Sequence, residues 1–249
     1  MRVAELALLR EWVRRDFRIR YTQTSMGALW AFLQPVALTV TFVFLFQHVA
    51  KIEAPVPYAS FVLPAMLVWT LFSVGVSNGA SAMTNSMYVA TKASYPRVVA
   101  PLSAALLALV DLVGGLILLP ILFFVEDAPV RLQLLPCLGA TLGCLMISAG
   151  VGSLLSALSI FIRDLRNLVP LGLQLLLLLT PVAYPVSRLP AALRGNPLAT
   201  FVNGFRSGLL DVPGPSAAEW IRSLLIALAV LATGLWYFHR VEKRFADVA

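Results

Sequence analysis

The chain has 249 residues, of which 59% are apolar and 12% charged, and its mean hydropathy is +0.86. This composition lies far outside the range of soluble domains and indicates a membrane protein. The formal net charge is +7, yet nucleic-acid binding is excluded, because the basic residues are not interleaved with stacking aromatic side chains on a soluble fold.

The first 20 residues predict an amphipathic helix that lies on the membrane surface. They contain no Pro or Gly, and their apolar residues recur at spacings of three and four while the charged residues face the other way. Asp16 and Arg20 are four residues apart, so they can form an ion pair where the helix approaches the headgroups. Two roles stay open for the segment 1–27: a fixed anchor at the membrane surface, or an element that moves and gates.

Long runs without charge predict six transmembrane helices. Each run can supply the roughly 20 residues that cross the hydrocarbon core of a bilayer. The first run carries Trp30 at its interfacial end, and Phe42 and Phe46 on one face further along. The fold class is therefore an all-α membrane protein, with spans expected at residues 28–50, 58–84, 98–125, 134–161, 168–186 and 221–239.

The segment NSMYVATKASYPR, residues 85–97, connects the second and third predicted spans. It is longer than a tight hairpin needs, and its centre is amphipathic, with a Lys and a closing Pro. We expect a short helix that lies across the membrane face and is available to a partner. An ordinary solvated loop is the alternative.

Asp111 is an acidic residue in the middle of the third predicted span. An ionisable side chain at that depth is costly and suggests a function by default. The other spans, however, offer only uncharged polar groups such as Asn78 and Gln174. We expect Asp111 to pair with a polar neighbour on another helix, whose close approach the nearby Gly114 and Gly115 would permit.

Residues 188–212, which precede the last span, alternate short apolar pieces with Gly and Pro breaks. This pattern predicts short re-entrant helices that dip back into the outer leaflet. Irregular backbone at that depth is tolerated only where it is buried in protein or lines a cavity. The segment is therefore expected to belong to a transport pathway.

The distribution of Lys and Arg predicts the orientation of the chain. With six spans both termini share one side, and that side carries thirteen Lys and Arg against six on the other. The positive-inside rule places both termini in the cytoplasm. The excess of positive charge there would face anionic lipid headgroups and any cytoplasmic partner.

Five runs, in order along nearly the whole chain, carry a resemblance to a known family. They are RDFRIRYTQTSMGALWAFLQP, TKASYPRVVAPLSAALLALVD, SALSIFIRDLRNLVPLGLQ, TPVAYP and NPLATFVNGFR. Together they resemble the membrane-spanning permease subunit of a type-2 ATP-binding-cassette exporter of lipid-linked polysaccharide. The similarity is greatest to O-antigen exporters, with capsule and teichoic acid exporters related.

The resemblance implies a permease made of two copies of this chain, in the bacterial inner membrane, with two copies of a cytoplasmic ATPase beneath it. ATP and Mg would bind that partner, while this chain would have no catalytic site, cofactor or metal. The phosphate-cradling pattern G-x-x-x-x-G-K-[ST] is indeed absent from the sequence. The implied substrate is an undecaprenyl-linked glycan, most of all O-antigen.

The resemblance also implies roles for particular residues. A gate helix that meets the lipid pyrophosphate would use Arg14, Arg15, Asp16, Arg18, Arg20 and Tyr21. A coupling helix that sits in the ATPase would use Asn85, Lys92, Tyr95, Pro96 and Arg97. The conduit, lined by the first and fifth spans, has as candidates Trp30, Phe42, Phe46 and Tyr184. The periplasmic mouth would be formed around Asn196, Phe201, Phe205 and Arg206.

Two other functions stay open at this point. An exporter of drugs or small lipids would share the architecture and have a narrower pore. An ion-coupled secondary carrier would need no ATPase and would depend on Asp111.

Overall fold

The computed structural model describes residues 3–21, 27, 29–92, 95–190, 193–242 and 245. Within these residues the regular structure is helical, and the only extended pairing is an isolated bridge between Val130 and Leu210. The all-α prediction is therefore confirmed over the described part of the chain. The helices are α1 (Val3–Tyr21), α2 (Leu29–Phe42), its π-helical continuation η1 (Val43–Val49), α3 (Tyr58–Lys92), α4 (Val99–Leu116), α5 (Leu118–Val125), α6 (Leu134–Ser159), α7 (Leu165–Leu179), the short 3-10 turn η2 (Val186–Arg188), α8 (Pro197–Leu209) and α9 (Ala217–Val241).

Four helical segments of the described part are long and apolar enough to cross a membrane: α3, α4 together with α5, α6 and α9. They correspond to the second, third, fourth and sixth predicted spans. The first and fifth predicted spans correspond to α2 with η1 and to α7, whose described apolar stretches, Pro35–Val49 and Asn167–Leu179, are shorter. The total of six spans, and the re-entrant course of residues 188–212, stay predictions.

The helix boundary predicted after residue 84 is not observed. Helix α3 runs on through Asn85 to Lys92, so residues 85–92 are its last two turns rather than a separate helix. The physical reason is the absence of Pro and Gly between Gly79 and Pro96, which leaves nothing to end the helix earlier. Residues 93–94 of the expected coupling segment lie outside the described residues.

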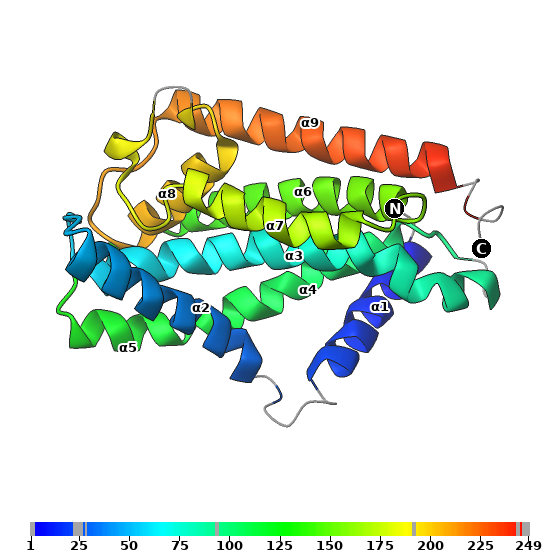
Figure 1. The fold of residues 1–249 in the computed structure, drawn as a ribbon, viewed down its shortest axis with the longest axis horizontal. Coiled ribbons are helices and arrows are strands. Elements are labelled where there is room, and N and C mark those ends of the chain that lie inside the picture. Colours follow the sequence, from blue (N-terminus) through cyan, green and yellow to red (C-terminus); the bar gives the residue numbers. More distant parts are fainter. Residues whose placement is uncertain are drawn as a thin grey trace.

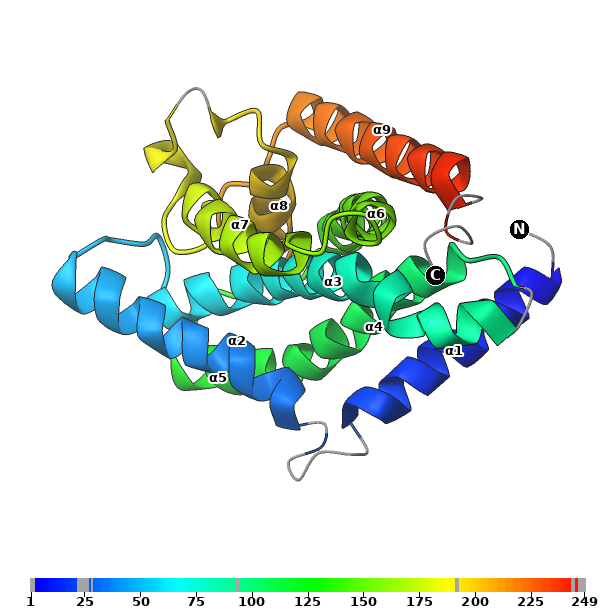
Figure 2. The same cartoon turned by 45° about the vertical axis from the view of Figure 1, so that its right-hand side comes forward.

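Helix α3 forms the centre of the bundle. Most of its apolar span, 89%, is buried inside the subunit, against 22% for α9. In Figure 1, α3, α6, α7 and α9 run along the long axis of the molecule, while α1 crosses it obliquely. The start of α1 and the ends of α3 and α9 lie at one end of the molecule (Figures 1 and 2), whereas α8 lies toward the opposite end in Figure 1.

Glycines let three of these helices touch through their backbones. A Cβ on Gly79 of α3 would lie 2.8 Å from the Cα of Gly152 in α6. A Cβ on Gly234 of α9 would lie 2.1 Å from the carbonyl oxygen of Gly150 in α6. Real Cβ atoms do not approach this closely, so these positions exclude every side chain and fix the spacing of α3, α6 and α9.

Gly234→Ala is therefore expected to destabilise the subunit by about 1–3 kcal/mol, since the added methyl group forces α9 away from α6. The measurement is thermal unfolding of the purified protein in detergent. Gly172→Ala is the matched control, because nothing lies within 4 Å of a Cβ built at Gly172. Equal melting temperatures for the two variants would contradict the close backbone contact.

Candidate functional site

Helix α1 is held against the bundle at its middle and at its C-terminal end. Near its middle, Trp12 is 7% exposed, and its ring lies 4.8 Å from the ring of Tyr95, in the connection between α3 and α4. At its C-terminal end, Tyr21 is also buried. A helix that only floats on the membrane surface would bury neither side chain in protein, so α1 is packed as part of the fold.

The buried carboxylate of Asp111 in α4 is paired with two residues of α1. Arg20 Nη1 lies 2.9 Å from Asp111 Oδ2, and the hydroxyl of Tyr21 donates a hydrogen bond to Asp111 Oδ1. Asp111 is only 2% exposed, so the ion pair supplies the counter-charge that a buried carboxylate needs. The expectation that Asp111 pairs with a polar neighbour on another helix is confirmed.

The ion pair that the spacing of Asp16 and Arg20 allows is not formed. Arg20 pairs with Asp111, while Asp16 pairs with Arg15, whose Nη2 lies 2.7 Å from Asp16 Oδ1. Asp16 also accepts a hydrogen bond of 2.9 Å from the hydroxyl of Ser103 in α4. The physical reason is burial: an exposed i, i+4 pair contributes only about 0.3–0.5 kcal/mol, less than the cost of an unpaired buried acid.

Two cavities meet at Arg20. The first, the α1 cavity, has a volume of about 540 Å³ and lies between α1, α3 and α4. The second, the α7 cavity, has a volume of about 460 Å³ and lies between α2, α3 and α7. Arg20 and Asn78 line both cavities. The two spaces therefore adjoin, with one cation at their junction.

A polar stripe on α3 runs along both cavities. Its members are spaced four residues apart, which places them on one helix face: Ser73, Ser77, Ser81 and Asn85. Gln174 of α7 adds an amide to the wall of the α7 cavity. Hydroxyl and amide groups of this kind can form hydrogen bonds with sugar hydroxyls and phosphate oxygens, and they carry no charge themselves. Sequence reasoning missed the stripe, although the recurrence of Ser and Asn every four residues was a readable signal.

The arginines of α1 divide between two sides of the helix. Arg15 lines the α1 cavity, with its guanidinium carbon 3.8 Å from the centre of the Trp12 ring. Arg14 lines a different cavity, together with Arg10 and apolar residues of α1 and α4. Arg18 is exposed. Of the six predicted gate residues, Arg15, Asp16 and Arg20 thus share a cavity, Tyr21 contacts Asp111, and the other two lie elsewhere.

The predicted coupling residues differ from one another in their surroundings. Asn85 lines the α1 cavity, Tyr95 contacts Trp12, and Pro96 is exposed. Arg97 Nη1 donates a 2.7 Å hydrogen bond to the carbonyl oxygen of Glu242, just after α9. Arg97 is therefore used within the chain, tying the α3–α4 connection to the end of α9. Lys92 belongs to the last turn of α3, and its side chain lies outside the described residues.

The candidate conduit residues are only partly available to a substrate. Phe42 is buried and packs edge-to-face on Phe46, with 5.4 Å between ring centres. The hydroxyl of the half-buried Tyr184 donates a 3.0 Å hydrogen bond to the carbonyl oxygen of Leu178. Trp30 lies in α2, with its side chain outside the described residues. Phe42 thus packs within the subunit, while Phe46 and Tyr184 keep part of their surface accessible.

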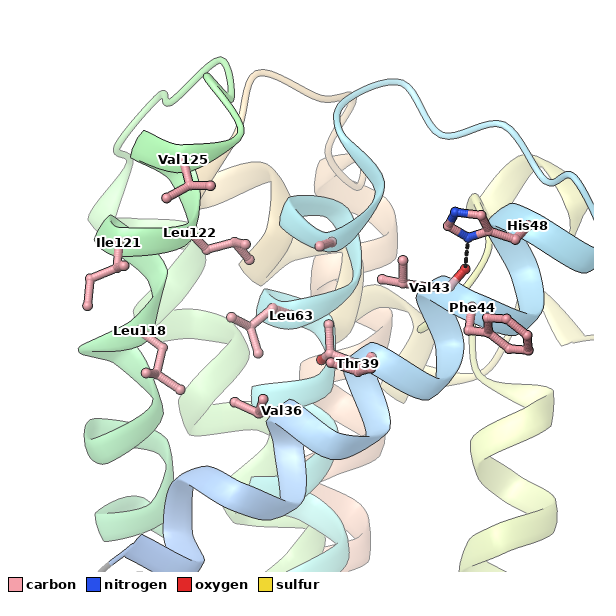
Figure 3. A pocket seen from close by; sticks show the side chains of 12 residues that line it. Val36, Thr39, Val43, Phe44, His48, Leu63, Leu118, Ile121, Leu122 and Val125 are labelled. Carbon is pink, nitrogen blue, oxygen red and sulfur yellow. Dashed lines mark hydrogen bonds between the residues drawn. The ribbon is translucent and has the colours of Figure 1, made fainter.

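Figure 3 shows an apolar groove that lies between α2 with η1, α3 and α5. Its volume is about 550 Å³, and Phe44 and His48 of η1 stand at its rim. His48 Nδ1 lies 3.4 Å from the carbonyl oxygen of Val43, within the π-helical segment. The walls offer hydrocarbon almost throughout, as a lipid-facing groove requires.

The residues predicted for the periplasmic mouth are mostly interior. Phe201, Phe205 and Arg206 of α8 are each at most 2% exposed, and Phe205 lines a cavity of about 790 Å³ between α4, α5, α6 and α8. Their place at a periplasmic mouth stays a prediction. Asn196 caps the helix, since its side-chain oxygen accepts a hydrogen bond from the backbone N–H of Leu198. The Gly and Pro of this segment predicted breaks in the helix, but they did not predict how deeply these side chains are buried.

Arg206 connects α8 to two other elements. Its Nε donates to the carbonyl oxygen of Phe61 at 2.9 Å, and its Nη2 donates to those of Val182 and Pro181 at 2.8 and 3.2 Å. The guanidinium carbon also lies 3.6 Å from the centre of the Phe61 ring. Arg206 therefore joins α8 to the start of α3 and to the chain that leaves α7.

Comparison with known proteins adds independent information. The model of the family described as "ABC-2 type transporter" matches residues 8–210. The O-antigen export system permease protein RfbA of Klebsiella pneumoniae is 25% identical over 242 residues, which cover 94% of this chain and 92% of that protein. The protein of the same description from Myxococcus xanthus is 27% identical over 248 residues, covering 96% and 94%.

Proposed function

The chain belongs to the ABC-2 type transporter family, and from this premise we propose that it is the permease subunit of an exporter of O-antigen-type polysaccharide. The observation that carries the proposal is the similarity to O-antigen export permeases along more than nine tenths of both chains. The polar stripe of α3 supports it, because uncharged hydroxyl and amide groups suit a sliding glycan better than a small apolar compound.

The proposed substrate is a glycan on an undecaprenyl pyrophosphate carrier, moved from the cytoplasmic to the periplasmic side of the bacterial inner membrane. Two copies of this chain would enclose the path, and two copies of an ATPase would supply ATP hydrolysis with Mg. The asymmetry of Lys and Arg supports a cytoplasmic position for both termini. That end of the molecule holds the start of α1 and the end of α3, the elements proposed to meet the ATPase.

The contact between Trp12 and Tyr95 offers a route from the ATPase to the substrate path. A force on the α3–α4 connection reaches α1 through these two rings. Because α1 forms one wall of the α1 cavity, its displacement would change that cavity and the junction with the α7 cavity. In this mechanism α1 is a moving gate, and the ATPase acts on it through the end of α3.

The alternative of an ion-coupled carrier loses its main support in the pairing of Asp111. A carboxylate that binds Arg20 and Tyr21 already has the partners that a transported cation would replace. The contacts with Arg20 and Tyr21 explain the presence of the acidic Asp111 in α4 as part of the fold.

Deletion of the gene is expected to remove the polysaccharide from the cell surface and to leave it inside the cell on its lipid carrier. The amounts can be measured with a surface immunoblot and by extraction of lipid-linked glycan. A plasmid copy restores the surface glycan. Unchanged surface glycan in the deletion strain, or an ATPase activity that responds to amphipathic drugs and ignores lipid-linked glycan, would contradict the proposal.

A further inference from the structure

Arg20 has an unusual combination of surroundings among the described residues: a buried acid as partner, and two cavities as neighbours. We infer that Arg20 exchanges its partner during transport, leaving Asp111 to bind the pyrophosphate of the lipid-linked substrate and returning to Asp111 when the substrate moves on. This inference rests on the proposed function and assigns one residue of the path a specific task.

The burial of the two partners differs in a way that favours such an exchange. The side chain of Arg20 is 30% exposed, whereas that of Asp111 is 2% exposed. The guanidinium can therefore turn toward a ligand in either cavity, while the carboxylate is enclosed by the bundle. Only one partner of this ion pair is free to move, and it is the one with the charge that attracts phosphate.

Asp111 keeps a partner when Arg20 leaves. The hydroxyl of Tyr21 donates to the other carboxylate oxygen, Oδ1, and does not depend on Arg20. Burial, and then the hydrogen bond to Asp111, raise the pKa of the Tyr21 phenol, so the group stays protonated and continues to donate. The cost of separating the ion pair is thus reduced but not removed, since a hydrogen bond replaces only part of a counter-charge.

Pyrophosphate has the chemistry to compete for Arg20. It carries more negative charge than a carboxylate, and guanidinium groups bind phosphate oxygens through two parallel hydrogen bonds. Asn78, which lines both cavities, supplies a further amide donor beside Arg20. Asp111 then acts as the competitor that keeps binding weak enough for release, because a carrier must let its substrate go.

This competition predicts effects of opposite sign. Asp111→Asn removes the competitor and is expected to tighten binding of undecaprenyl pyrophosphate several-fold. Tyr21→Phe leaves Asp111 more dependent on Arg20 and is expected to weaken binding. Arg20→Gln removes the phosphate ligand and is expected to weaken it by a factor of about ten or more, the usual value of a hydrogen bond to a charged group. A purely structural role for the pair predicts that all three variants weaken binding.

The test uses the full-length protein, purified and placed in phospholipid nanodiscs, with radiolabelled undecaprenyl pyrophosphate as the probe. Inorganic pyrophosphate and phosphatidylglycerol serve as competitors, which separates a pyrophosphate site from a site for anionic lipid headgroups. Arg10→Gln is the matched control, because it removes a positive charge from the same helix but lines a different cavity. The thermal unfolding of each variant shows whether it is folded.

The inference is supported if Asp111→Asn tightens binding, Arg20→Gln loses it and Arg10→Gln leaves it unchanged. It is overturned if folded Asp111→Asn binds no better than wild type, if Arg10→Gln loses as much as Arg20→Gln, or if phosphatidylglycerol displaces the probe as well as pyrophosphate does. If wild type itself does not bind the probe, the proposed function fails. If wild type binds and the Arg20 and Asp111 variants match it, only the exchange fails.

Discussion

Replacing Arg206 with methionine is expected to destabilise the purified subunit by about 3 kcal/mol. The substitution removes the guanidinium donor from the carbonyl oxygens of Phe61, Val182 and Pro181. The Phe61 carbonyl keeps its helical partner in α3, whereas the loss of a donor at the other two interior carbonyls carries a cost. The change should appear as a lower melting temperature in detergent. The buried position of Arg206 makes the effect a property of the fold and independent of any substrate.

Two further variants separate this role from a general loss of positive charge. Arg206→Lys keeps the charge but lacks the planar fork that bridges three carbonyls, so its melting temperature is expected to lie between wild type and Arg206→Met. Arg188→Met is the matched control, since Arg188 is exposed on the η2 turn. If Arg206→Met unfolds at the same temperature as Arg188→Met, the proposed structural role is wrong.

Trp12→Ala is expected to separate ATP hydrolysis from export. The substitution removes the ring that contacts Tyr95, and with it the contact between α1 and the α3–α4 connection. In the complex with its ATPase, hydrolysis should continue while export of lipid-linked glycan falls by a factor of ten or more, which corresponds to about 1.4 kcal/mol of lost coupling. Both activities can be measured in the same proteoliposomes.

Truncation of a buried Trp also costs stability, about 3–5 kcal/mol, so the comparison needs a conservative partner. Trp12→Phe keeps an aromatic ring against Tyr95 and is expected to retain most of the export. If Trp12→Ala loses hydrolysis and export in equal measure, or keeps both, α1 does not transmit the action of the ATPase. An intact complex on size-exclusion chromatography shows that the variant still binds its partner.

The sequence allowed the helical fold and the approximate positions of the long apolar helices to be predicted, because the spacing of charged residues is a strong signal in a membrane protein. It also indicated that Asp111 needs a partner. The identity of that partner did not follow from the local pattern. Asp16 lies one turn from Arg20 along α1, but Asp111, 91 residues away, is buried, and the larger desolvation cost decides the pairing.

The length of α3 and the burial of α8 were harder to predict for a related reason. The residues after Thr84 are polar and resemble a connection, yet they contain no residue that stops a helix, and α3 continues to Lys92. Phe201 and Arg206 lie in a segment whose Gly and Pro predicted helix breaks, and tertiary packing encloses both side chains. The pattern of a single segment does not reveal which neighbours will cover it.

The glycine contacts limit how the subunit can change shape. Backbone lies on backbone at Gly79 and Gly152, and again at Gly150 and Gly234, so no side chain separates α3, α6 and α9 at these two crossing points. These close contacts hold the three helices together as a frame, and a conformational cycle is expected mainly in the elements attached to it. Helices α1, α2 and α7 border the two cavities and lie outside that frame. Alternating access would then be measured as displacement of α1, α2 and α7 relative to α3, α6 and α9.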